Sequence, residues 1–490
     1  MKRVLGNLLW ATGSKLLDAA VRFFTVPIVL AHFGKLDFGL LALAYAVNVF
    51  LTIADFGLNI NAVRRLSDQF VRHDWPGMNR LVSACTFYYS AIGLVNFVGV
   101  LVVGYMAPHW FNLDAQQSRV FWLMMISLGL SSWIFWTFII HRQVIQAAGQ
   151  LGWDERNTIV ASIAAVALVA VTVYAGLDLV TYFALSMALG LIPVALRWWK
   201  VRRLVPGFKF AFAPDWASFR PMVNASLLLF LMSLAQMAAN NLRPLLLASQ
   251  GTLESVADYR IIQGVVSFAL MVSGGVLNVV YPEVARLEAR GDTGRLRDFS
   301  QRGTSLLLWA HVLLLVPLAL SSELILRLYV GAEFTHLTLP LAIWLLTCLA
   351  GHNAIFSSVL LSRGRFGLLT ASSIFNAALT LGLAYLLIPQ HGLDAVIWTY
   401  VLFVLLQALV FYGFLVPPLH LGSLRQFATM LFKPVAGAVV ATVLSLALAY
   451  AVGLPLWTAG LFSALAIVVL SLGFGEVLAN LRVLMPARAH

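Results

Sequence analysis

The chain has 490 residues, of which 61% are hydrophobic and only 11% are charged. Soluble domains carry about 25% charged residues, so this composition excludes an ordinary soluble protein. It predicts an all-α integral membrane protein, because the alternating pattern of a membrane β-barrel is absent. The formal net charge of +12 is compatible with nucleic acid or with membrane orientation, and its distribution along the chain decides between them.

Sequence features of enzymes and cofactor sites are missing. The two cysteines, Cys85 and Cys348, fall inside hydrophobic stretches and indicate neither a disulfide framework nor a metal site. The chain contains no Walker-type phosphate-binding motif, and its loops are short. We therefore expect no enzymatic activity, no cofactor and no ATPase of its own.

The first hydrophobic stretch, residues 5–34, is long enough to cross a bilayer, yet it contains three charges. Lys15, Asp18 and Arg22 are spaced i, i+3 and i+7, which puts them on one helical face. A charge at membrane depth costs at least about 2.5 kcal/mol on insertion scales. Asp18 and Arg22 can pair within the helix, which leaves Lys15 without a local partner. We interpret this helix as one wall of a polar, net-cationic cavity, in which Asp18 has a possible coupling or gating role.

Hydrophobicity predicts about fourteen membrane spans. They cover roughly residues 5–31, 38–60, 81–106, 119–141, 157–176, 178–199, 221–248, 256–281, 304–326, 336–361, 366–388, 392–416, 431–453 and 455–479. An even number puts both termini on the same side of the membrane.

The basic residues define that side. With a cytoplasmic N-terminus, 25 of the 32 Lys and Arg residues lie in or beside the predicted cytoplasmic segments. Positive charge is enriched in cytoplasmic loops of membrane proteins, so this bias supports the span count and puts both termini in the cytoplasm. The positive charge is thus mainly an orientation signal, and no nucleic-acid partner is expected.

Two short segments resemble each other. Residues 26–34 and 243–251 share a proline, a leucine, an alanine and a glycine at a constant offset of 217 residues. Six predicted spans separate them, so the two copies run in the same direction. This predicts two pseudo-symmetric six-helix lobes, residues 1–208 and 209–418, followed by two C-terminal helices in residues 419–490.

The second span has a continuous polar face. Tyr45, Asn48, Thr52, Asp55 and Asn59 follow one another at steps of three and four residues. Asp55 is expected near the cytoplasmic end of this span, as a structural ion pair or gate.

The seventh span has a similar face, formed by Gln236, Asn240 and Arg243. We interpret Lys15, Arg22, Arg243, Asn48, Gln236 and Asn240 as substrate-binding candidates that converge on a central cavity. Hydrogen bonding between packed helices is the alternative for the Asn and Gln residues, and snorkelling to the interface is the alternative for Arg22.

Residues 30–44 (LAHFGKLDFGLLALA), 54–58 (ADFGL) and the Arg64-Arg65 pair resemble the N-terminal signature of the polysaccharide transporter family. This family comprises oligosaccharide-lipid flippases of the multidrug/oligosaccharidyl-lipid/polysaccharide exporter superfamily. The resemblance implies alternating access around a cationic cavity. It also implies movement of undecaprenyl-diphosphate-linked repeat units to the periplasmic leaflet for capsule, O-antigen or exopolysaccharide synthesis. Its implied partners are the lipid-linked glycan, the bilayer and other polysaccharide assembly proteins.

Three alternatives remain. The Ser-Ser-Ala-Asn-Arg-Glu-like motif of the related lipid II flippases is absent, which argues against a peptidoglycan precursor. A cation-coupled multidrug exporter would favour an acidic cavity. A membrane glycosyltransferase or polymerase would need a large polar loop with catalytic carboxylates, which the short loops argue against.

The span count generates a topology prediction. Reporter fusions after Arg72, Arg290 and Arg425 should report cytoplasm, and fusions near Asn112 and Gln390 should report periplasm. A reversed signal at any one of these five positions would contradict the fourteen-span topology.

Overall fold

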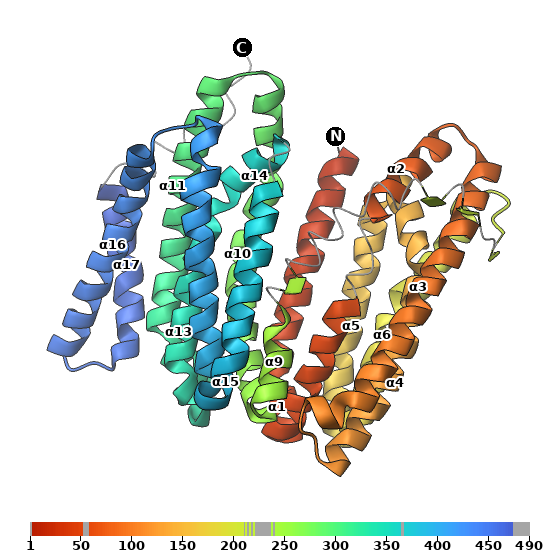
Figure 1. Cartoon of the computed structure of the whole chain (residues 1–490), viewed down its shortest axis with the longest axis horizontal. Helices are drawn as coiled ribbons and strands as arrows, with labels where there is room; N and C mark the ends of the chain where they lie inside the picture. Colours follow the sequence, from red (N-terminus) through yellow and green to blue (C-terminus); the bar gives the residue numbers. More distant parts are fainter. Residues whose placement is uncertain are drawn as a thin grey trace. The chain divides into compact units, whose positions relative to one another are not determined.

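The structure is a computed structural model of the whole chain. It describes residues 2–51, 58–209, 211–212, 215–216, 219–220, 237–238, 241–363 and 367–473. Within these residues every regular element is helical, which confirms the predicted all-α class (Figure 1). Hydrocarbon offers no hydrogen-bond partners to the backbone, and an α-helix satisfies its own peptide groups.

The chain divides into two compact units, Met1–Arg260 and Ile261–His490. The predicted lobe boundaries at 208 and 418 remain a prediction. Unit 1 contains α1 (Lys2–Leu51), α2 (Leu58–Val71), α3 (Trp75–Trp110), α4 (Ala115–Ala147), α5 (Leu151–Ala175), α6 (Leu179–Gly190), α7 (Ile192–Leu204), α9 (Arg243–Gln250) and the first turns of α10 (Leu253–Ala289).

Unit 2 contains the rest of α10 and the helices that follow it. They are α11 (Thr293–Leu320), α12 (Ser322–Tyr329), the 3-10 helix η2 (Ala332–Leu337), α13 (Thr338–Thr347), the 3-10 helix η3 (Cys348–Asn353), α14 (Ala354–Ser362), α15 (Gly367–Val410), the π-helix η4 (Phe411–Leu415), η5 (Pro417–Leu419), α16 (Leu424–Ala451), η6 (Leu456–Thr458) and α17 (Ala459–Gly473).

Glycines break the two longest helices. Gly34 inside α1 has φ 77° and Gly392 inside α15 has φ 51°, a region that residues with a Cβ adopt only with strain. These breaks separate the predicted first span from the second and the eleventh from the twelfth.

Nine helices in the described part of the chain are long and apolar enough to cross a membrane. Two of these nine, Gly13–Val49 and Thr370–Leu419, contain the glycine breaks. The protein is therefore a multi-pass membrane protein, while the count of fourteen remains a prediction. Most of the predicted seventh span, residues 221–248, lies outside the described residues.

Side-chain contacts define one end of unit 1, which we name the Gly34 end. The His32 ring lies 3.2 Å from the Leu177 carbonyl oxygen, and Asn112 donates to the Ser249 carbonyl oxygen at 3.4 Å. Leu177 and Asn112 lie just beyond α5 and α3, and Ser249 lies in the last turn of α9. The span order predicts these positions on one side of the membrane.

The opposite end, which we name the Arg142 end, joins other predicted loops. Asn79, at the start of α3, donates to the Gly207 carbonyl oxygen at 3.2 Å, and Arg142 at the end of α4 contacts Asp154 near the start of α5. The two sets of loops therefore separate as the predicted alternation requires. Which end faces the cytoplasm remains a prediction.

The helices α3 and α4 pack against each other along their lengths in unit 1 (Figure 1). Small residues allow the close approach: a Cβ at Gly93 would lie 2.9 Å from the Trp136 Cβ, and a Cβ at Gly129 would lie 2.5 Å from the Phe97 ring. Membrane helices commonly associate through small residues, because lipid supplies no hydrophobic driving force between them.

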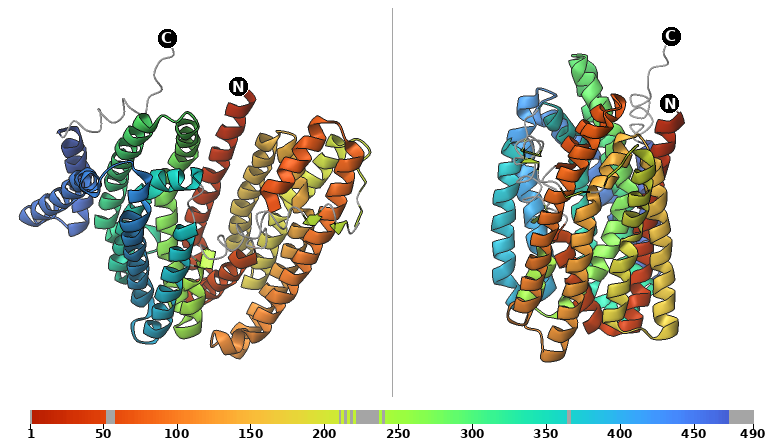
Figure 2. Two further views of the ribbon diagram at one scale, coloured as in Figure 1. Left: turned by 45° about the horizontal axis from the view of Figure 1, so that its top comes forward. Right: turned by 90° about the vertical axis from the view of Figure 1, so that its right-hand side faces the viewer.

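In unit 2, α11 packs against α16 and α17 (Figure 2). Trp309 is buried in this contact, and a Cβ at Gly437 would lie 2.8 Å from its ring. Residues 297–301 and 421–426 contact each other at one end of the unit, and Ser321 donates to the Trp457 carbonyl oxygen at the other.

The Gly34 end of unit 1 contains a close backbone contact that yields a prediction. A Cβ at Gly39 would lie 2.2 Å from the Leu253 carbonyl oxygen, so Gly39→Ala must push α1 away from the start of α10. We expect a cost of about 1–3 kcal/mol, typical of overpacking, measured as a lower thermal unfolding midpoint in detergent. The control is Gly13→Ala, on the same helix but with open space around the added methyl group. Equal midpoints for the two variants would contradict the contact.

Candidate functional site

Three charged residues lie on the first half of α1, as predicted. Lys15 and Arg22 are exposed on the surface of the protein. Arg22 Nε lies 2.9 Å from Asp18 Oδ2, and these two side chains are 70% and 41% exposed. The ion pair predicted from the sequence is therefore present. Lys15 has no hydrogen bond or ion pair within the described part of the chain.

The residue before Lys15 fixes this helix to α5. Ser14 is 1% exposed and donates a hydrogen bond to Glu155 Oε2. Successive helical residues point about 100° apart, so a Ser14 side chain directed at α5 leaves Lys15 on a neighbouring, open face.

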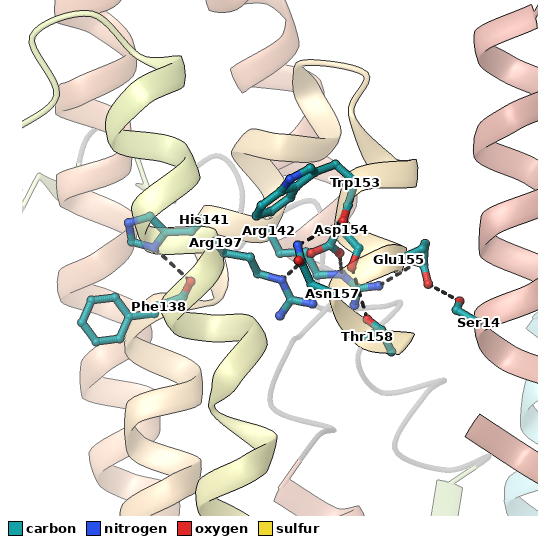
Figure 3. Close-up of polar contacts among 10 residues, drawn as sticks. All are labelled: Ser14, Phe138, His141, Arg142, Trp153, Asp154, Glu155, Asn157, Thr158 and Arg197. Atoms are coloured by element: carbon teal, nitrogen blue, oxygen red, sulfur yellow. Dashed lines mark hydrogen bonds and ion pairs between the residues drawn. The ribbon is translucent and has the colours of Figure 1, made fainter. Parts of the chain in front are cut away.

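Glu155 belongs to a network of four charges, of which all but Arg142 are buried (Figure 3). Asp154 Oδ2 accepts from Arg142 Nε at 3.1 Å, and Asp154 Oδ1 accepts from Arg197 Nε at 2.5 Å. Arg142 Nη2 also lies 3.7 Å from Glu155 Oε1. The network joins α4, α5 and α7, and Ser14 extends it to α1 (Figure 3).

The local sequence explains how α4 and α5 bring these residues together. Gly149 has φ 70° and reverses the chain between the two helices, a conformation that favours glycine. The tight turn places Arg142, near the end of α4, beside Asp154, near the start of α5.

The charges of the network cancel. Asp154 is fully buried and the Arg197 side chain is 9% exposed, so neither would be tolerated alone at this position. Two carboxylates face two guanidinium groups, which leaves no net charge for a ligand. We therefore assign this network to the support of α1, α4, α5 and α7 and not to direct binding. Asp154 and Glu155 were not among the residues predicted from the sequence, although two adjacent acids stand out in a chain with 20 Asp and Glu residues.

The remaining candidates lie in different surroundings. Arg243, the first residue of α9, is 2% exposed within unit 1. Asn48 is half-buried on the second half of α1. That Lys15, Arg22, Arg243 and Asn48 share a cavity remains a prediction. Gln236, Asn240 and Asp55 lie outside the described residues.

Unit 1 also has an apolar cavity of about 350 Å³ near the Gly34 end. Its lining comes from α1, α3 and α9 and includes Val47, Val100, Val103, Trp110, Phe111 and Leu245. Without charged groups, this cavity does not suit a diphosphate or a sugar. No group of three or more His, Cys, Asp or Glu side chains in the described part of the chain could hold a metal ion.

Comparison with known proteins identifies the family. The profile of the polysaccharide biosynthesis protein family matches residues 4–288, more than half of the chain. The chain belongs to this family. The resemblance inferred from residues 30–65 is thereby confirmed. No curated protein sequence matches the chain.

Solved structures of transporters share the fold. A structure titled lipid II flippase MurJ in an inward closed conformation has 11% sequence identity and a TM-score of 0.74, with 96% of this chain and 99% of that chain covered. An inward-facing multidrug resistance MATE transporter of the MOP superfamily has 12% identity and a TM-score of 0.66, with 84% and 96% covered. The multidrug transporter DinF-BH in complex with R6G has 16% identity and a TM-score of 0.57, with 84% and 95% covered.

These neighbours are transporters and flippases, not enzymes, in agreement with the expectation from the sequence. At these identities they establish the fold alone. The family and the fold together support transport or flipping of a lipid-linked substrate in general.

The buried network generates a stability prediction. Asp154→Asn leaves the Arg142 and Arg197 guanidinium groups without a carboxylate at this position and should cost about 3–5 kcal/mol, because a buried charge loses its partner. Asp18→Asn breaks an exposed pair and should cost at most about 1 kcal/mol. Thermal unfolding of both variants in detergent measures the difference. Similar midpoints would show that the network does not support the fold.

Proposed function

We propose that this protein flips polyprenyl-diphosphate-linked oligosaccharide repeat units from the cytoplasmic to the periplasmic leaflet of the bacterial inner membrane. The single observation that carries the substrate class is Lys15, an exposed cation on a membrane-spanning helix with no ion pair among the described residues. Family membership supplies the link to polysaccharide synthesis.

Moving such a substrate across a bilayer sets a specific physical requirement. A diphosphate and several sugars must cross a hydrocarbon layer about 30 Å thick. A cation held in a hydrated cavity lowers the cost for the diphosphate, and Arg additionally offers a two-pronged hydrogen-bond donor. Lys15 supplies such a cation, with Arg22 about two helical turns further along α1 and partly neutralised by Asp18. The polyprenyl tail can stay in lipid throughout.

The anchoring of α1 supports this assignment. Ser14 binds Glu155, and Glu155 belongs to the neutral network around Asp154. A charged side chain beside a fixed residue loses less conformational entropy on binding, because the helix that carries it is already positioned. Lys15 would thus be held ready for an anionic group.

The alternatives differ in the charge that they require. A lipid II flippase would use the same fold and a similar diphosphate, and it differs only in the glycan. A cation-coupled multidrug exporter would need an acidic site for its drug, whereas Asp18 on α1 is already paired with Arg22. A membrane glycosyltransferase would need catalytic carboxylates, whereas Asp154 and Glu155 are bound to arginines.

The remaining parts of the proposal follow from the sequence. Two six-helix lobes would alternate in access, both termini would lie in the cytoplasm, and other polysaccharide assembly proteins would supply and consume the glycan. Arg243, Asn48, Gln236 and Asn240 would complete the substrate-binding surface, with Asp18 and Asp55 as gating groups.

The test is glycan export in a strain that lacks the native gene and carries variants at equal membrane levels. Lys15→Ala should reduce export at least about tenfold, since a charge-assisted contact to phosphate contributes about 1.5–3 kcal/mol. Lys15→Arg should retain part of the activity, because the charge persists. The control, Arg327→Ala, removes an exposed arginine in unit 2 that is paired with Glu323 and should export normally. Full export by Lys15→Ala would overturn the cationic site.

A further inference from the structure

Two neighbouring membrane segments of unit 2 lose regular α-helical geometry. The helix α13 ends at Thr347, and the chain continues as the 3-10 helix η3 before α14 begins. The helix α15 continues into the π-helix η4. Short 3-10 and π segments inside longer helices often mark functional positions. Irregular backbone at membrane depth is tolerated where it lies against protein or a cavity.

Three polar side chains connect these two segments. His352 Nε2 lies 2.6 Å from the Tyr412 hydroxyl oxygen, and the same hydroxyl contacts Asn353 Oδ1. The other ring nitrogen, His352 Nδ1, lies 2.7 Å from the Leu349 carbonyl oxygen. The His352 and Tyr412 rings are nearly parallel, at an interplanar angle of 14°. We name these three residues the His352 relay.

Counting hydrogens shows what the relay lacks when His352 is neutral. The Leu349 carbonyl can only accept, so Nδ1 carries the single ring N–H and Nε2 becomes an acceptor. The Tyr412 hydroxyl then faces two acceptors, Nε2 and Asn353 Oδ1, with only one hydrogen to donate. One of the two contacts would bring two lone pairs together.

A second proton on the ring resolves this conflict. With Nε2 protonated, His352 donates to the Tyr412 oxygen and Tyr412 donates to Asn353 Oδ1, so all three contacts become hydrogen bonds. We propose that His352 is a proton-binding site of unit 2, held between η3 and η4. The proton comes from water and returns to water, and no covalent bond other than N–H is formed.

The surroundings of the relay limit the site to one proton. His311 on α11 lies close to η3, because its Nε2 is 3.0 Å from the position that a Cβ at Gly351 would take. Two protonated imidazoles so close would repel each other. The buried Cys348 begins η3, whereas α13 and α14 carry no ionisable side chain. The hydrogen bonds of the relay run to the Leu349 carbonyl oxygen and among its own three side chains.

This proposal goes beyond flipping, since it concerns a cation that the protein binds whatever its substrate. The proton bridges two irregular segments, so its arrival and departure change which contacts hold them together. A site of this kind would connect a proton gradient to a conformational step, because a ligand shifts an equilibrium only through its differential affinity for the two states.

The test reads the protonation state directly and does not depend on transport. The full chain is labelled with ¹⁵N-histidine in nanodiscs, and imidazole nitrogen signals are followed between about pH 5 and 8, the range in which histidine charge changes. His352→Gln assigns the His352 signals. We expect His352 to show two protonated nitrogens over part of this range in which the control, His141, shows one.

His141 is a matched control within the same chain. Its Nδ1 lies 3.0 Å from the Phe138 carbonyl oxygen, the same type of contact as in His352. Its buried Nε2 has no hydrogen-bond partner in the described part of the chain, so nothing there favours a second proton.

Two variants test whether the contacts with Asn353 and Tyr412 favour the second proton on His352, or whether His352 is only packed in place. Asn353→Leu removes the competing acceptor and frees the Tyr412 hydrogen for Nε2, so the doubly protonated signal should be lost at the pH at which the wild type shows it. Tyr412→Phe removes the partner of Nε2 and should cause the same loss; unchanged His141 signals report an intact unit 1. A wild-type His352 with one N–H throughout would overturn the proposal. It would mean that the Asn353 amide is turned over and donates to Tyr412.

Discussion

The hydrocarbon core of a membrane offers no hydrogen-bond partners, and each polar group of this chain inside it must find one in the protein, in water or in a ligand. The backbone meets this constraint with helices. The charged side chains of unit 1 meet it in two ways. Asp154 is fully buried and lies between two guanidinium groups, whereas Lys15 is exposed on a membrane-spanning helix. The first arrangement is complete in itself, whereas Lys15 has no ion pair among the residues that the structure describes.

This difference is the physical basis of the functional assignment. A buried pair whose charges cancel gives weak evidence of a ligand, because the partners need each other to offset their desolvation. An exposed cation on a span indicates contact with water or with an anion, because lipid alone would make it costly. The contact between Ser14 and Glu155 connects the two, so that the neutral network holds the helix that presents Lys15.

Local spacing decided which features could be predicted from the sequence. The Asp18–Arg22 pair follows from a four-residue separation on one helix, and the break at Gly34 follows from a glycine between two hydrophobic stretches. The Asp154–Arg197 contact joins residues 43 positions apart and depends on how α5 and α7 pack, which no periodicity reveals. The position of Lys15 is thus predictable, while the residues that hold its helix in place are not.

The buried histidines show the same limit on prediction from the sequence. The sequence does not distinguish His141, His311 and His352 from one another. In the structure each places Nδ1 near a backbone carbonyl of its own helical segment, three or four residues earlier. This contact fixes the same tautomer in all three rings and leaves Nε2 as the variable position. Only at His352 does Nε2 meet a hydroxyl that already has another acceptor. In the irregular turn η3, the consecutive side chains of His352 and Asn353 both contact the Tyr412 hydroxyl. These contacts need one more hydrogen than a neutral His352 provides, and a bound proton can supply it.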